Sequence, residues 1–271
     1  MFFMLMSEMP VSNRSSFILM KTFFCILPIF LATALFAEVD KDALPDVEDG
    51  FEVDFFVREP HIINPSSLCF DKHGRLYVGA GPQYRQPKED SPTDYIKILI
   101  DEDGDGVAEK VKTFAEGLNC VQSMAWKGDE LWVANAPEIT VLRDTDGDDV
   151  ADEYQIIFTG LNNLRHSVHG LNWGPDGWLY GCHGVFTHSK VGKPGTPDAE
   201  RDPINAGIWR YHPTRHEFEV FAWGTSNPWG LDFDENGDWF ATACVIPHYY
   251  QITQGGRYFR QAGQHFNPYV Y

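Results

Sequence analysis

Two acidic segments carry carboxylates at alternate positions. In DEDGDGVAEK, Asp101, Asp103 and Asp105 alternate with other residues, and Gly104 and Gly106 let the backbone curl until the carboxylates face one point. Oxygen ligands gathered in this way bind hard cations such as Ca²⁺. Glu109 and the carbonyl of Val107 complete the set. The pattern predicts a calcium site, and its alternative is a solvated acidic turn.

The same pattern recurs in DTDGDDVADE. Here the candidate ligands are Asp144, Asp146, Asp148 and Asp152, with the carbonyl of Val150. An EF-hand loop has a glutamate at its twelfth position, where these two segments have Lys112 and Gln155. We therefore expect a calcium site of a different or weaker kind than an EF-hand.

A third group with possible chemistry is RHSVHG, which contains Arg165, His166 and His169. Histidine changes its charge near neutral pH and serves as a general acid or base. A single histidine is more often a hydrogen-bonded structural residue than a catalyst. Two histidines beside an arginine favour a functional site.

A repeated strand motif must position these residues. The segments that start at Asn64, His166 and Ser226 each contain an apolar alternation, a turn rich in Asp, Asn and Gly, and a second apolar run. A weaker fourth copy starts at Val121. The turn glycines are Gly74, Gly128, Gly177 and Gly237. Each copy predicts two antiparallel strands joined by a tight turn.

The repeat predicts an all-β fold, a β-propeller. Successive turn glycines lie about 50 to 60 residues apart, which suits four-stranded blades with variable loops, and no helical periodicity intervenes. We expect about three and a half blades over residues 51–271, an incomplete ring truncated at its C-terminal end and six blades in the full protein. An incomplete ring leaves a blade edge with unpaired strand groups, so we expect the chain to be a fragment of a longer protein or to be completed by a partner.

In such a ring the residues before each repeat surround the central channel. These are Asn64, Asn119, Cys120, His166, Ser167, His169 and Asn227. His183 and His248, at the ends of second strands, are expected near the same channel mouth.

The N-terminus has the layout of a secretory signal. Lys21 precedes an apolar run that ends at Ala37, where we expect cleavage. Residues 1–37 are thus a predicted signal peptide, 1–19 a mis-assigned start and 38–50 a linker. The expected location is secreted or periplasmic, and an uncleaved anchor would make the protein membrane-associated.

Charge and cysteines narrow the remaining possibilities. The 271 residues carry a formal net charge of -18, which argues against nucleic acid as a partner. Outside the predicted signal lie Cys69, Cys120, Cys182 and Cys244, which either pair in an oxidising compartment or serve as small buried apolar residues. We favour the second reading.

Two segments resemble the soluble quinoprotein glucose and sorbosone dehydrogenases. HSVHGLNWGPDGWLYGCHG is similar to the family's strand in which a histidine precedes a GPDG turn, and this implies that His166 is the catalytic base. GTSNPWG resembles the GxRNPxG stretch that supplies arginine and asparagine to pyrroloquinoline quinone (PQQ), with Asn227 kept and Ser226 in place of the arginine. The resemblance implies PQQ binding by Asn227, and Arg165 and His169 at the expected channel mouth are further candidates for binding this cofactor. Ca²⁺ is a second expected cofactor, on the evidence of the acidic segments.

A closer resemblance covers Gly50 to Tyr271. GTSNPWGLDFDENG and QGGRYFRQAGQHFNPYVY are similar to the propeller region of large exported bacterial proteins described as membrane-bound dehydrogenases. In such proteins a cytochrome c module with a CxxCH haem site commonly follows. The sequence contains no CxxCH, so a cytochrome c partner module is expected beyond Tyr271.

Three functions follow as hypotheses. The first is a dehydrogenase-like propeller that oxidises a sugar or another alcohol with a quinone. The second is a non-catalytic carbohydrate- or protein-binding propeller, in which Trp178, Trp229 and Trp239 stack on sugars; core packing is the favoured reading of these tryptophans. The third is a calcium-dependent lactonase-type hydrolase with a central metal held by Asn64, Asn119 and Asn227.

Overall fold

The computed structural model describes residues 44–84, 92–161, 168–263 and 265. Two compact units divide at Asp49, and the fold below is that of Gly50–Tyr271. The predicted signal peptide, residues 1–37, lies outside the described residues, as do Arg165, His166 and Ser167. Within the described part of the chain, no helix is long and apolar enough to cross a membrane.

The first two sheets each contain four antiparallel strands in chain order. The first comprises β1 (Pro65–Phe70), β2 (Leu76–Ala80), β3 (Asp94–Ile100) and β4 (Lys110–Leu118). The second comprises β5 (Val121–Lys127), β6 (Glu130–Asn135), β7 (Glu138–Arg143) and β8 (Glu153–Thr159). Both follow the up-and-down order of a propeller blade.

The third sheet contains an inserted hairpin. Its strands are β9 (His169–Trp173), β10 (Leu179–His183), β13 (Gly207–His212) and β14 (Glu217–Trp223), and the hairpin is β11 (Ser189–Val191) with β12 (Asp202–Ile204). A short 3-10 helix, η2 (Asp198–Glu200), lies within this insertion. The fourth sheet has three strands: β15 (Asn227–Phe233), β16 (Trp239–Cys244) and β17 (Tyr249–Ile252).

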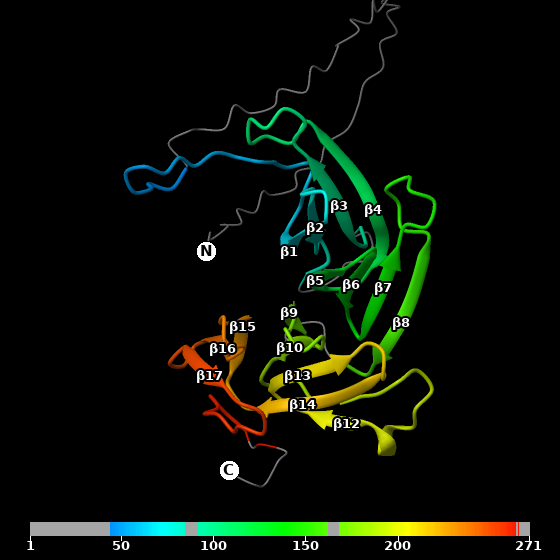
Figure 1. Ribbon diagram of the computed structural model, residues 1–271, viewed down its shortest axis with the longest axis vertical. Coiled ribbons are helices and arrows are strands. Elements are labelled where there is room, and N and C mark those ends of the chain that lie inside the picture. Colours follow the sequence, from blue (N-terminus) through cyan, green and yellow to red (C-terminus); the bar gives the residue numbers. More distant parts are fainter. Residues whose placement is uncertain (1–43, 85–91, 162–167, 264, 266–271) are drawn as a thin grey trace, which may run out of the picture. The chain divides into compact units, whose positions relative to one another are not determined.

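The predicted all-β propeller is confirmed. The first strands of successive sheets contact one another, β1 with β5, β5 with β9 and β9 with β15, so these are the inner strands of four blades (Figure 1). The fourth blade has one strand more, β17, than its two-strand repeat predicted. None of the cysteines 69, 120, 182 and 244 is in a disulfide. Cys120 and Cys182 are buried, as the favoured reading predicted, whereas Cys69 is half-buried and Cys244 is exposed, so for Cys244 that reading was wrong.

The predicted turns form as their glycines require. Gly74, Gly177 and Gly237 have φ angles of 78°, 81° and 83° and close three-residue loops, in which the glycine N–H donates to the carbonyl three residues earlier. Gly128 has a φ of 63° at the first position of a two-residue loop between Lys127 and Glu130, the position of glycine in a type II′ turn.

Strand direction gives the blades two different ends. Asn64 precedes β1, and its carbonyl accepts the N–H of Gly81, which follows β2 (3.0 Å). Asp94 begins β3 beside them. We call this end, where inner strands begin, the mouth face. The glycine turns and the acidic loops after β3 and β7 lie at the opposite end, the turn face.

Aromatic side chains fill the spaces between blades. Trp132 of the second blade and Trp209 and Tyr211 of the third belong to one buried cluster. Another joins Tyr77 and Phe114 of the first blade to Leu131 of the second. Because the indole of Trp209 lies against the backbone of β10, position 181 has no room for a side chain: a Cβ there would come within 2.2 Å of its Cζ2.

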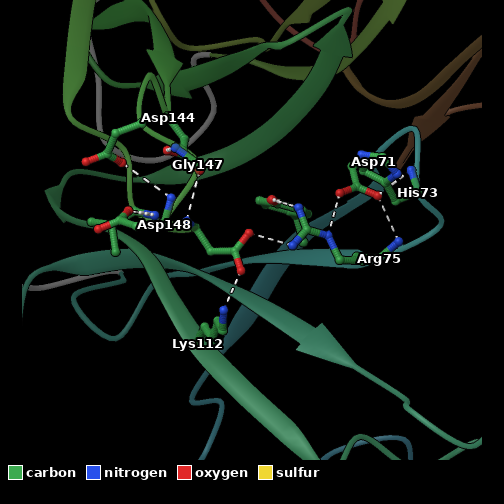
Figure 2. A network of polar contacts seen from close by, with 11 residues as sticks. Asp71, His73, Arg75, Lys112, Asp144, Gly147 and Asp148 are labelled. Carbon is green, nitrogen blue, oxygen red and sulfur yellow. Dashed lines mark hydrogen bonds and ion pairs between the residues drawn. The ribbon is translucent and has the colours of Figure 1, made fainter.

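An acidic loop ties the second blade to the first. Asp149 has a φ of 72°, in the left-handed region, at the position that Gly106 (φ 88°) occupies in the preceding acidic loop. Its carboxylate accepts from Arg75 Nη1 at 2.5 Å and from Lys112 Nζ, both of the first blade. The Ala151 N–H also donates to the carbonyl of Phe114 (2.8 Å). Figure 2 shows Arg75, from the turn before β2, and Lys112, from β4, reaching this loop.

Replacement of Gly181 by alanine tests the blade packing. The rigid, buried indole of Trp209 cannot yield, so Gly181→Ala should lower the free energy of unfolding by about 3 kcal/mol or more, the upper end for overpacked cores. In the control Gly237→Ala, the new Cβ would meet only Pro175 Cγ at 3.5 Å. Its left-handed backbone should cost about 1 kcal/mol. Urea unfolding measures both, and an equal cost would contradict the packing.

Replacement of Asp149 by asparagine tests the tie between blades. Asparagine tolerates the left-handed conformation but loses the charge, so Asp149→Asn should destabilise by about 1.5–3 kcal/mol. The hydrogen bond from Lys112, with Arg75, holds the pKa of Asp149 below its usual range. This stabilisation is therefore complete above the unfolded pKa of about 3.9 and disappears as pH falls through the folded pKa.

Unfolding of wild type and Asp149→Asn between about pH 2 and pH 7 measures this difference. The control is Glu102→Gln, which removes the exposed ion pair with Lys110 and should cost less than about 1 kcal/mol. A constant difference across the whole pH range would show that the carboxylate of Asp149 is not the source of the stabilisation.

Candidate functional site

The first acidic loop gathers its predicted ligands. Asp101 accepts the N–H groups of Gly104 (2.6 Å) and Gly106 (3.0 Å), which curls the backbone around its carboxylate. One oxygen from each of the four carboxylates lies within 4.8 Å of the others; these are Asp101, Asp103, Asp105 and Glu109. All four oxygen donors can face one hard cation.

The second loop repeats this geometry with one difference. Asp144 accepts the N–H groups of Gly147 (2.7 Å) and Asp149 (2.9 Å), and its oxygens cluster with those of Asp146 and Asp152. The fourth predicted ligand, Asp148, does not join them; its carboxylate accepts the N–H of Val150 (2.8 Å). Both clusters lie at the turn face.

The mouth face holds a cavity of about 530 Å³ between the first, second and fourth blades. It is lined by Asn64, Ser66, Asp94, Gln122 and Trp229, among others. Gln122 is 8% exposed, and its Oε1 has no hydrogen-bond partner among the described residues. Buried polar atoms are normally paired, so this oxygen is a site for a ligand or water.

Asp94 holds the wall of this cavity in place. Its buried carboxylate accepts the N–H groups of Gln83 (3.2 Å) and Cys120, and burial raises its pKa although these hydrogen bonds oppose the rise. Cys120 has a φ of 54°. Asp94 thus fixes the strained turn at which the chain enters β5, and it was not among the residues predicted from the sequence.

Aromatic and imidazole rings continue the mouth face towards the third blade. His169, the first residue of β9, is buried, and its ring stacks on Trp229 with centroids 4.4 Å apart and planes 11° apart. Trp178 and Trp239 are 8% and 4% exposed, as expected for core residues, whereas Trp229 is 41% exposed and lines the cavity. Of these three tryptophans, only Trp229 is available to a ligand.

His183, at the end of β10, is fully buried. Its Nδ1 accepts the N–H of Ala206 (3.2 Å), so its Nε2 donates to Ser189 Oγ (2.8 Å). Burial lowers the pKa of His183 to about 3, and the nearby His169 and Arg260 contribute. The ring is therefore neutral at physiological pH and has a structural role. His248, expected at the same mouth, is exposed.

Asn227 begins β15 at this face, and Ser226 directly precedes it. The Oδ1 of Asn227 is buried without a hydrogen-bond partner among the described residues. Ser226 is fully buried, and its hydroxyl donates to Gln261 Oε1 (2.7 Å). Position 226 therefore presents no cation.

Arg260 is a functional candidate that the sequence did not reveal. It is 9% exposed, and burial lowers its pKa. The residues 257–260 contain no periodic pattern that marks a strand, and contacts with β14 and with Asn205 bring them to the mouth face. The one signal in the sequence was the pair Arg257 and Arg260, two basic residues close together in an acidic chain.

Two solved structures illustrate the likeness in fold. The PQQ-bound aldose sugar dehydrogenase from Streptomyces coelicolor is 17% identical, with a TM-score of 0.52, over 72% of this chain and 62% of that protein. The pyranose dehydrogenase PQQ domain from Coprinopsis cinerea is 11% identical, with a TM-score of 0.51, over 72% and 53%. The chain spans less than two thirds of either protein, and at these identities the likeness shows the fold alone.

The comparison with curated proteins found no match. Nothing in these comparisons bears on the expected resemblance to membrane-bound dehydrogenases, which stays a prediction. A family model matches residues 43–269, and the chain therefore belongs to the family described as a domain of unknown function, DUF7133.

Proposed function

We propose that the mouth face binds a quinone of the PQQ type and that the protein oxidises a sugar or another alcohol. The observation that carries this proposal is the stacked pair His169 and Trp229 beside the cavity. The amide oxygen of Asn227, at the start of β15 on the same face, has no hydrogen-bond partner among the described residues. A planar face, an amide and a cavity of about 530 Å³ suit a flat polar ligand.

The residues present fit such a group. PQQ is anionic, so its site needs a cation. Position 226 supplies none, but Arg260 is buried one residue from Gln261, the hydrogen-bond partner of Ser226. When bound, the quinone would accept a hydride, which carries both electrons of the oxidation, from the alcohol. Asn227, Arg165 and His169 would hold it.

His166 is proposed as the residue that accepts the proton of the alcohol. It lies outside the described residues, three positions before His169 at the start of β9. His169 lies at the mouth face, and the closeness of His166 to it in the sequence supports this role. Electrons would pass to a cytochrome c module of the exported full-length protein.

A sugar-binding function without catalysis is the second candidate. The exposed indole of Trp229 at the cavity supports it, because sugar rings stack on exposed aromatic faces.

The lactonase-type alternative has less support, because the carboxylate clusters of the described residues lie at the turn face, away from Asn64 and Asn227. We propose that these clusters bind Ca²⁺ and stabilise the loops.

Calcium binding is tested by unfolding with Ca²⁺ or with EGTA. At about 100 times its dissociation constant, Ca²⁺ should stabilise the protein by about 2.7 kcal/mol per site. Asp101→Asn and Asp144→Asn should each lose one such contribution, whereas Asp198→Asn, on η2 and outside both clusters, should lose none. Identical unfolding with Ca²⁺ and EGTA would leave both segments as solvated turns.

The quinone proposal is tested by titrating PQQ into the full-length protein and following quinone absorbance, with and without Ca²⁺. We expect saturable binding and dye reduction with at least one sugar. His166→Ala should lower dye reduction about 10²–10⁴-fold, as loss of a general base does, and the exposed control His248→Ala should not. A folded protein that binds no PQQ would leave the sugar-binding function in its place.

A further inference from the structure

Arg260 is a buried cation without a carboxylate partner in the part of the chain that the structure describes. Its Nε donates to the carbonyl of Ala262 (3.2 Å), and its Nη1 donates to the backbone carbonyl (2.5 Å) and Oδ1 (3.2 Å) of Asn205. All three acceptors are neutral. Buried charges are normally paired, because desolvation of an unpaired ion is costly.

One edge of the guanidinium has no acceptor in the described part of the chain. No acceptor for Nη2 lies among the described residues, and Nη2 points towards the exposed turn at Gly263, where a Cβ would lie 3.4 Å from it. Nη2 carries two N–H groups, and each can donate a charge-assisted hydrogen bond to a carboxylate oxygen.

The protein holds this side chain in a fixed position. The Gly255 N–H donates to the carbonyl of Phe221 (2.7 Å), and Trp223 exchanges backbone hydrogen bonds with Gly256 (2.8 Å) and Tyr258 (2.7 Å). The segment thus runs parallel along the edge of β14. Gly224, with a φ of 100°, permits this approach, because a Cβ there would come within 2.2 Å of the Tyr258 carbonyl oxygen.

The surroundings of Arg260 are also poor in negative charge. His183 and His265 both interact with Arg260, and the pKa of His265 is lowered to about 4 by burial and by Arg257 and Arg260. In a chain of net charge -18, this is a local concentration of cationic and neutral nitrogen groups. An anion from outside the protein would be attracted there.

We propose that Arg260 binds a carboxylate group of the ligand at the mouth face. This inference rests on the proposed function for the location of the site and names the charge that its ligand must carry. The carboxylate belongs either to the quinone or to an acidic substrate such as a sugar acid. Asn205 orients the guanidinium, and Nη2 makes the contact.

The experiment measures ligand affinity by calorimetry on the full-length protein. The probes are PQQ, its trimethyl ester, which lacks the negative charges, and gluconate. Arg260→Gln should weaken PQQ binding at least about tenfold, consistent with loss of a charge-assisted hydrogen bond, and leave ester binding unchanged. Arg260→Lys keeps the charge without the fork and should lie between. The control Arg215→Gln, in an exposed ion pair with Glu217, should match wild type.

The outcomes separate this inference from the proposed function. Equal PQQ affinity of wild type and Arg260→Gln would overturn the inference and leave a quinone site standing. Binding of gluconate, but not PQQ, that depends on Arg260 would support the inference and contradict the quinone. Failure of a folded wild type to bind either carboxylate would overturn the inference. If Arg260→Gln does not fold, the inference is tested by the affinities of the wild type for PQQ and for its ester. Tighter binding of PQQ would support the inference, and equal affinities would overturn it.

Discussion

The structure depends on one constraint: each four-stranded sheet has two apolar faces, and a neighbouring blade must cover them. The clusters around Tyr77, Trp209 and Trp239 lie between successive blades, and each draws side chains from both. Such packing fixes how far one blade can slide past the next. It therefore fixes which inner-strand starts meet, and hence the composition of the mouth face. Glycine at 181 and the Asp149 tie act on the same interfaces, one by admitting an indole and the other by linking loop to strand.

The two ends of the blades differ in chemistry. The turn face carries clustered carboxylates suited to a hard cation, and the mouth face carries a cavity, stacked rings and a buried guanidinium, with an amide oxygen that has no partner in the described part of the chain. A calcium ion bound in the acidic loops would thus stabilise the scaffold at a distance from the ligand. This separation allows metal binding and ligand binding to be removed independently by substitution.

Features encoded locally could be predicted from the sequence. The turn glycines, the strand pairs of each repeat and the acidic loops all depend on residues adjacent in the chain, and each appears where the pattern placed it. Features that depend on packing could not. Nothing nearby in sequence distinguishes the exposed Trp229 from the buried Trp178, and Arg260 reaches the mouth face through contacts of its segment with β14 and with Asn205. In the sequence, Asp149 resembles the other acidic residues of its loop. Its bonds to Arg75 and Lys112 depend on the packing of the first blade against the second.

The central claim is that the mouth face binds an anionic ligand through Arg260, apart from the acidic loops. A crystal structure of the full-length protein grown with PQQ and Ca²⁺ tests it most directly. The account predicts a carboxylate of the quinone within hydrogen-bond distance of Arg260 Nη2, near Asn227 and Trp229, and anomalous calcium peaks at the loops of Asp101 and Asp144. An Arg260 guanidinium paired with a carboxylate of the protein itself, and no quinone at the mouth face, would contradict it.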